Sequence, residues 1–268
     1  MPKYLFIIFT IYCQLSDSKA QELEFLYRIN QTCHLMAVDP LQQLYIVEAT
    51  TQSIHKYSTE GKLLYTYSDN NLGKLTDLDA QNPMQVLSYW KAYNDVVILD
   101  RTLSRLAQFN LDNLGFYQVP AVCLSNDQHV WIYDPDNFRL VKIDAKGGII
   151  TESNDLSSLL NAELSVYSII EEENRVYMNI PKLGILVFDN LGNYERLLNL
   201  KEVDFFQVYK ENLFFIQKNR LKSYHFPSFQ ILDIPLEVLE AGAKQIQLSP
   251  NYLFIRYPNK VDVYKIKK

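Results

Sequence analysis

VWIYDPDNFRLVKIDAKG, residues 130–147, holds two apolar runs separated by a polar turn. LYIVEATTQSIHKYSTEG, residues 44–61, repeats the arrangement. Short or alternating apolar runs rich in Val, Ile and Tyr predict β-strands, and the polar residues between them predict a hairpin. The phrase occurs six times, roughly every forty residues, with further copies beginning at Val96, Val176, Leu213 and Tyr252. A strand-rich repeat of this length predicts the blades of a β-propeller.

The two ends of the chain complete each other. The sixth copy stops before a fourth strand, whereas residues 24–29 form a strand with no preceding partner. Pairing residues 24–29 with residues 261–266 would close the ring and cover two open strand edges. The sequence therefore predicts an all-β, six-bladed propeller that is closed by its N-terminal strand.

The segments between the hairpins contain the inner strands, two helices and one insertion that the sequence predicts. We expect the innermost strands of the six blades at 35–38, 84–88, 121–125, 167–170, 205–209 and 245–248. Leu and Ala at helical spacing predict short helices at 155–164 and 235–243. Residues 68–83 resemble an insertion whose Asp69, Asp77 and Asp79 could bind calcium, but the spacing is not that of an EF-hand. We expect a solvated loop there.

The first twenty residues have the architecture of a signal peptide. Lys3 gives a basic start, residues 4–11 form a short apolar core, and Ser18 and Ala20 are small residues at the positions that a signal peptidase reads. We expect cleavage before Gln21 and a single propeller domain over 21–268, with no transmembrane segment. The expected location is periplasmic or associated with the outer membrane.

The net charge argues against nucleic-acid binding, and the cysteine positions argue against a disulfide. The chain has 26 Lys and Arg against 31 Asp and Glu, and without residues 1–20 the numbers are 24 and 30. A net negative chain lacks the positive field that nonspecific nucleic-acid binding needs. Cys33 and Cys123 fall on blades one and three, which are not neighbours, so we expect two buried free thiols rather than a disulfide.

The expected channel residues are polar but almost uncharged. The candidate binding residues at the channel mouth are His34, Gln85, Ser168 and Gln245. Without a carboxylate pair, or a base beside a nucleophile, this set predicts no catalytic residue, metal or cofactor. The alternative for His34 is a hydrogen-bonded structural residue.

Two further sets could form a binding face. Basic residues precede the third strand of four expected blades, and together they could bind an anion: Arg105, Arg139, Arg220 and Lys260. The alternative is local pairing, since Asp100 and Asp134 lie across the same hairpins as Arg105 and Arg139. Tyr89 and Trp90 could anchor a partner, or could pack between blades.

The hairpins resemble NHL-type repeats. Asp134-Pro135-Asp136-Asn137-Phe138-Arg139-Leu140 is the best match to the Asp, turn, Asn-x-Arg pattern of that family, and residues 218–221 and 259–261 match in part. Residues 52–53 and 183–184 depart from the pattern. Residues 82–87 and 97–104 are similar to a family of secreted Bacteroidota propeller proteins, and the periplasmic plug subunit of the type 9 secretion translocon is a candidate relative.

These observations predict a binding function rather than turnover. We expect an exported, non-catalytic interaction module that is monomeric on its own and docks on an envelope protein, such as a subunit of an outer-membrane translocon or assembly complex. The alternative is a propeller that uses its channel as a small-molecule hydrolase or lyase, or to bind sugars.

Overall fold

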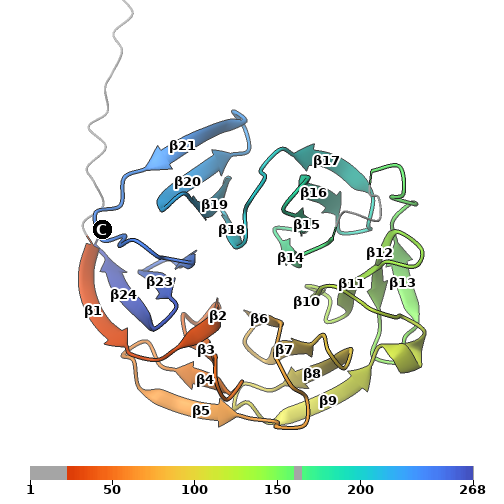
Figure 1. Ribbon diagram of the computed structural model, residues 1–268, viewed down its shortest axis with the longest axis horizontal. Helices are drawn as coiled ribbons and strands as arrows, with labels where there is room; N and C mark the ends of the chain where they lie inside the picture. The colour runs from red at the N-terminus through yellow and green to blue at the C-terminus, as the bar shows by residue number, and fades with distance from the viewer. Residues whose placement is uncertain (1–22, 160–164, 268) are drawn as a thin grey trace, which may run out of the picture.

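The computed structural model describes residues 23–159 and 165–267, which form six four-stranded antiparallel sheets arranged in a ring (Figure 1). The predicted fold is confirmed. Blades one and two consist of β2 (Cys33–Val38), β3 (Leu44–Glu48), β4 (Ile54–Tyr57), β5 (Leu63–Tyr67) and of β6 (Asp77–Asn82), β7 (Gln85–Trp90), β8 (Asp95–Leu99), β9 (Arg105–Asn110). Blades three and four consist of β10 (Val122–Leu124), β11 (Val130–Asp134), β12 (Arg139–Ile143), β13 (Ile149–Glu152) and of β14 (Ser168–Glu172), β15 (Arg175–Ile180), β16 (Gly184–Asp189), β17 (Tyr194–Leu198). Blades five and six consist of β18 (Phe206–Tyr209), β19 (Asn212–Gln217), β20 (Arg220–His225), β21 (Gln230–Ile234) and of β22 (Gln245–Leu248), β23 (Tyr252–Tyr257), β24 (Lys260–Ile266), β1 (Leu23–Ile29).

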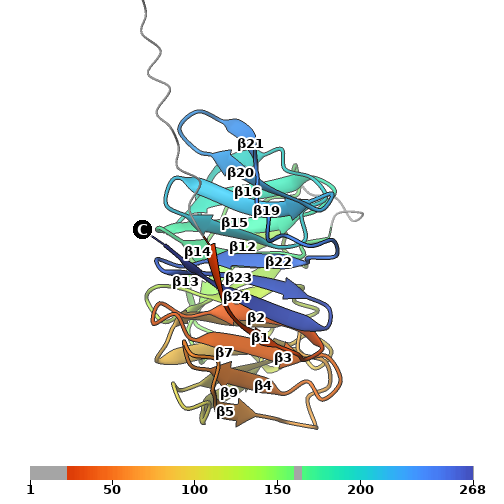
Figure 2. The same ribbon diagram turned by 90° about the vertical axis from the view of Figure 1, so that its left-hand side faces the viewer.

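The ring is closed by the N-terminal strand, as the sequence predicts. β1 is the outermost strand of blade six and runs antiparallel beside β24, with Leu23 opposite Ile266 and Ile29 opposite Val261 (Figure 2). The Arg28 guanidinium spans the seam and donates to both carboxylate oxygens of Asp262, at 2.5 and 2.9 Å. The seam therefore joins residues from opposite ends of the chain by a strand ladder and a bidentate ion pair.

The core lies between the blades. Each of the six apolar clusters combines residues of two neighbouring blades. In one of them, blade one packs against Phe254 and Val263 of blade six through Cys33, Met36 and Ile46. Cys33 and Cys123 are buried free thiols, as expected. Strand alternation explains this arrangement, because alternate residues of a blade face the blade before and the blade after it.

Blade two differs from the sequence prediction by one strand. Its innermost strand is β6, so residues 68–83 contain a strand of the sheet rather than only an inserted loop, and residues 84–88 belong to the second strand, apart from Met84, which lies in the turn. Asp and Asn are depleted in strands, and for this reason the DLDAQN segment resembled a solvated turn. As a consequence, Arg105 begins the outermost strand β9 rather than the third strand.

The predicted helix at 235–243 is wrong, because this segment consists of turns and irregular chain. Its Leu236, Val238 and Leu239 pack against the cluster between blades five and six, and this burial accounts for their apolar spacing. Of the other predicted helix, residues 155–159 contain a turn, and 160–164 lie outside the described residues. None of the helices found in residues 23–159 and 165–267 has the length and apolarity to cross a bilayer.

Candidate binding site at the channel mouth

Six innermost strands surround the axis of the ring, which we call the channel: β2, β6, β10, β14, β18 and β22 (Figure 1). All six begin at the same end of the channel, because every blade follows the same order from its inner to its outer strand. We define the channel mouth as the cluster at this end formed by His34, Asp77, Tyr167, Phe205, Gln245 and Arg256. Blades one, two, four, five and six each contribute at least one of these side chains.

Arg256 occupies blade six at the channel mouth. It lies opposite Gln245 in the β22–β23 ladder, and its Nε donates to Gln245 Oε1 at 3.1 Å. Its Nη1 donates to the Cys33 carbonyl of blade one at 3.3 Å, and its guanidinium lies 4.8 Å from the centre of the Phe205 ring of blade five. Arg256 thereby contacts both neighbouring blades. Arg256 is only 3% exposed.

An aromatic pair lies beside this arginine. Tyr167 and Phe205 meet edge to face with ring centres 6.2 Å apart. Tyr167 is 46% exposed, so it presents much of its ring to solvent. Burial raises the pKa of the Tyr167 hydroxyl, and Asp204 raises it further, whereas Arg256 lowers it. The hydroxyl therefore stays protonated at neutral pH and can donate a hydrogen bond.

His34 is held in one orientation by blade two. Its Nε2 donates to the Leu75 carbonyl at 2.8 Å, which leaves Nδ1 buried and without a protein partner among the described residues. Burial lowers the pKa of His34, and the Leu75 carbonyl only partly opposes this effect. At neutral pH the ring is therefore neutral, with its unprotonated Nδ1 as a hydrogen-bond acceptor.

The expectation of an almost uncharged channel is wrong. β6 and β14 place four carboxylates along the channel side of blades two and four: Asp77, Asp79, Glu171 and Glu172. Burial raises the pKa of Asp77 to about 7, against the hydrogen bond from Thr76. Burial, with Glu173 and Asp79 nearby, raises the pKa of Glu172 to about 7. Two carboxyl groups of the channel thus titrate near neutral pH. The described residues contain no group of three or more His, Cys, Asp or Glu placed to hold a metal ion.

Several inner-strand side chains join neighbouring blades. Gln245 Nε2 donates to the Met36 carbonyl at 2.8 Å, and Gln207 both donates to the Leu248 carbonyl and accepts from the Leu248 amide. Asp79 accepts from the Leu124 amide at 2.9 Å. These polar groups lie at the channel, but their hydrogen bonds are used to hold the ring together.

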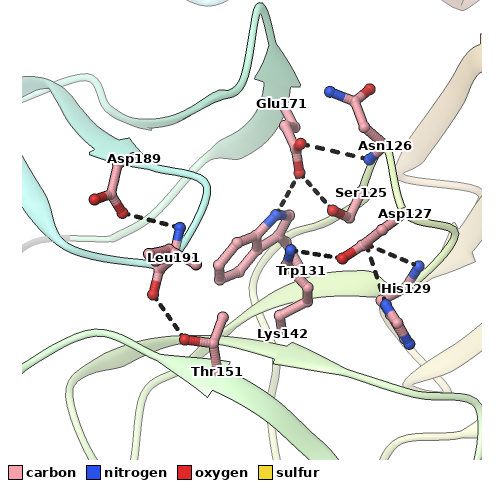
Figure 3. A network of polar contacts seen from close by, with 10 residues as sticks. All are labelled: Ser125, Asn126, Asp127, His129, Trp131, Lys142, Thr151, Glu171, Asp189 and Leu191. Carbon is pink, nitrogen blue, oxygen red and sulfur yellow. Dashed lines mark hydrogen bonds and ion pairs between the residues drawn. The ribbon is translucent and has the colours of Figure 1, made fainter.

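Glu171 is the most deeply buried of these connections. Figure 3 shows its contacts with Trp131, Ser125 and Asn126. Its carboxylate lies in blade four and accepts from Trp131 Nε1 at 2.6 Å and from Ser125 Oγ at 2.7 Å, both in blade three. On the same blade Lys142 Nζ lies 4.9 Å from the centre of the Trp131 ring and 2.9 Å from Asp127 Oδ2. The network therefore fixes blade three against blade four through one carboxylate.

The structure distributes the predicted site residues unequally. His34 and Gln245 lie at the channel mouth, and Ser168 begins the inner strand β14. Gln85 begins the second strand of blade two, where its amide lies 3.4 Å from Gln128. Tyr89 and Trp90 are 0% and 1% exposed and pack between blades, so they present no aromatic surface to a partner.

The basic residues do not form one unpaired set. Three of them do begin third strands, but each has a carboxylate partner. Arg139 lies 3.0 Å from Asp134, Arg220 lies 3.0 Å from Asp233, and Lys260 lies 2.7 Å from Glu240. Arg105 lies on another strand, 3.8 Å from Asp69, and Asp100 instead accepts from its own turn. The local-pairing interpretation is supported for Arg139.

Sequence reasoning missed Arg256, Tyr167 and Phe205. The one available signal was the charge of Arg256 inside the apolar run YLFIRY at 252–257, where the alternation predicts burial. Tyr167 and Phe205 carry no signal of their own, because nothing in the sequence shows that these residues of blades four and five meet.

Comparison with known proteins agrees on the fold. No protein-family model matches the chain, and no curated protein matches it. Virginiamycin B lyase from Staphylococcus aureus superimposes with a TM-score of 0.61 and 13% identity over 92% of this chain and 100% of that chain. The WD40 domain of Pan2 from Neurospora crassa gives a TM-score of 0.66 and 8% identity, over 92% and 96%. BamB from Moraxella catarrhalis gives a TM-score of 0.53 and 10% identity over 92% of this chain and 98% of that chain.

These similarities establish the propeller fold but no particular family or function, because the sequence identities are low. The similar structures include a lyase and a WD40 domain, so the fold fits enzymes and binding proteins alike. Function must therefore be argued from the site.

Proposed function

We propose that this protein is an exported, non-catalytic binding module of the cell envelope, and that its partner protein docks over the channel mouth. The observation that carries the proposal is the exposed ring of Tyr167, packed edge to face against Phe205 and next to Arg256. Tyr and Arg are enriched among the residues that dominate binding energy at interfaces, particularly near the centre of the contact. The flat end of a propeller offers the surrounding area.

The envelope location rests on the sequence. Residues 1–20 have signal-peptide architecture and lie outside the described residues. The resemblance to secreted Bacteroidota propellers favours a subunit of an outer-membrane translocon or assembly complex as the partner. The chain would then act by occupying a partner, as a monomer that joins a larger complex.

A small-molecule lyase or hydrolase is a second candidate, favoured by one specific observation. Burial brings the pKa of Asp77 to about 7, and His34 Nδ1 is an unprotonated, unpartnered nitrogen at the same channel mouth. Groups that titrate near the working pH suit general acid–base catalysis. Virginiamycin B lyase and this chain also share a propeller fold.

Affinity purification after crosslinking of envelope membranes tests the first proposal. We expect the wild-type protein to recover one envelope protein at near-stoichiometric yield and a Tyr167→Ala, Phe205→Ala double variant to lose it. Tyr65→Ala is the matched control, because Tyr65 is a 42% exposed aromatic residue on the outermost strand β5. Equal recovery by the double variant contradicts the proposed docking surface.

Turnover assays on lactones, esters and glycans test the second candidate. Catalysis through the channel predicts an activity that Asp77→Asn or His34→Ala removes while partner recovery is retained. Turnover that both substitutions leave unchanged contradicts it.

A further inference from the structure

Arg256 is a buried cation that no carboxylate of the described residues neutralises. Its hydrogen bonds go to an uncharged amide oxygen of Gln245 and to the Cys33 carbonyl, and the Phe205 ring covers one face. The two other buried cations within residues 23–159 and 165–267 differ in this respect. Lys56 lies 3.8 Å from Asp39, and Lys142 lies 2.9 Å from Asp127.

The missing counter-charge is energetically unfavourable in the unliganded protein. Burial lowers the pKa of Arg256, yet a guanidinium stays charged at neutral pH because its ordinary pKa is so high. A buried charge is normally paired because desolvation penalises it strongly. Dipoles of two carbonyl groups and the face of an aromatic ring offset only part of this penalty.

The geometry also indicates what kind of group would complete the site. Nε and Nη1 already have protein acceptors, the Cys33 thiol also lies beside the guanidinium, and Phe205 covers a face, so a ligand can approach only the edge of the fork that these groups leave uncovered. A planar guanidinium matches a planar carboxylate in shape and charge. The exposed Tyr167 stands beside the same position and can donate a hydrogen bond.

We propose that Arg256 at the channel mouth binds a carboxylate group, presented by an acidic side chain or the C-terminus of the docked partner. This inference rests on the proposed function, because it assigns the chemistry of the group that the partner inserts into the channel mouth. The Tyr167 and Phe205 rings form the apolar rim around the bound group. Without the partner, small carboxylates from solution should occupy the same position weakly.

The first test uses acetate as the probe and thermal unfolding as the readout, with sodium chloride at equal ionic strength as the reference. We expect acetate at roughly five times its Kd to raise the wild-type midpoint by about 2–4 °C relative to chloride. Arg256→Met should lose this response. Arg175→Met is the matched control, because Arg175 pairs with Glu195 on another blade and should retain the full response.

The variant also has a distinctive behaviour without acetate. Replacing an unneutralised buried charge by an apolar side chain of similar length is often neutral or stabilising. We therefore expect the Arg256→Met midpoint in chloride to equal or exceed that of the wild type. If this variant fails to fold, Arg256→Lys takes its place, and loss of the fork should then weaken acetate binding about tenfold. Acetate binding by either folded variant at wild-type strength overturns the proposal.

The remaining arms separate the sources of the anion. A short synthetic peptide of glycine and alanine with a free C-terminus should displace acetate, whereas its C-terminal amide should not, and glutamate within an amidated peptide should restore binding. Inorganic phosphate that outcompetes acetate, or acetate that acts no better than chloride, overturns the carboxylate assignment. If Arg256→Met loses acetate binding but still recovers the partner, only this inference is contradicted. The Tyr167→Ala, Phe205→Ala variant tests the docking surface separately, because the proposed function requires that it lose the partner.

Discussion

Removing the Glu171 carboxylate should cost more stability than any surface charge of this chain. Glu171 is 1% exposed, and it accepts from Trp131 Nε1 and Ser125 Oγ at 2.6 and 2.7 Å. A hydrogen bond to a charged group contributes about 1.5–3 kcal/mol. Glu171→Ala breaks these two short bonds and leaves both donors buried, and it also removes a longer bond of 3.4 Å from the Asn126 amide. We expect the free energy of unfolding to fall by about 3–6 kcal/mol.

A set of variants separates the carboxylate from its neighbours. Glu171→Gln keeps one oxygen acceptor but turns an amide group toward a donor, so it should cost about half as much. Trp131→Phe removes the indole donor, and together with Glu171→Gln it should show a coupling energy of about 1–2 kcal/mol in a double-mutant cycle. Glu195→Ala is the control, because its pair with Arg175 is partly exposed and should contribute about 0.2–1 kcal/mol.

Urea unfolding followed by circular dichroism measures these values, and an unchanged dependence on urea shows that the two-state comparison holds. The Trp90 indole is the only other Trp of the chain, so its fluorescence reports unfolding in the Trp131→Phe variant. A loss below about 1 kcal/mol in Glu171→Ala, or a zero coupling energy, would refute the reasoning that blade four is fixed to blade three through this carboxylate.

Four further outcomes are expected. Deleting residues 23–29 should lower the midpoint by far more than a loop deletion of equal length, because it exposes the β24 edge and removes the Arg28–Asp262 pair; a shift of a few degrees contradicts ring closure. The folded-state pKa of Asp77 is about 7, above the ordinary value of an unfolded aspartate, so the folded state binds the extra proton between roughly pH 4 and 7. Stability should therefore fall as pH rises through this window, and Asp77→Asn should reduce the slope, with Glu172 accounting for the part that remains; an unchanged slope in urea titrations argues against a buried Asp77 carboxyl. Arg139→Ala should cost roughly 0.2–1 kcal/mol and Asp134→Ala about the same without additivity, and a cost above 2 kcal/mol would mean that the pair is more than a surface contact. Mass spectrometry of the mature protein should find Gln21 at its N-terminus if the proposed export is correct, and an intact Met1 would contradict export by cleavage.

Local sequence patterns predicted the strands correctly where the blades share the same hairpin pattern. The hairpin of 130–147 could be recognised because both strands are short apolar runs and the turn is polar, and the structure places Asp134 opposite Arg139 across it. The prediction failed in blade two, where β6 has two aspartates in six residues. Propensity favours a loop for such a segment, but pairing with β7 and burial at the channel override that preference.

Residues of the site were only partly predictable for a related reason. His34 and Gln245 were placed near the channel because inner strands precede each hairpin. The role of Gln245 was not readable, since its partners are the Met36 carbonyl of blade one and the Arg256 side chain of the next strand. Tyr89 and Trp90 illustrate the opposite error, because their aromatic character is equally suited to an interface and to the core.

The sequence by itself determined the number of blades, the strands of every blade except blade two, and the closure of the ring by the two ends. These properties follow from the repeat period and from the need to cover the open strand edges at the two ends of the chain, and both features are visible in the sequence. Only the tertiary structure decided which side chains meet at the channel mouth. Arg256, Phe205 and Cys33 come from three blades, and their approach depends on the twist and packing of whole sheets against one another, which no local pattern encodes. The unneutralised charge of Arg256 is therefore a property of the assembled ring.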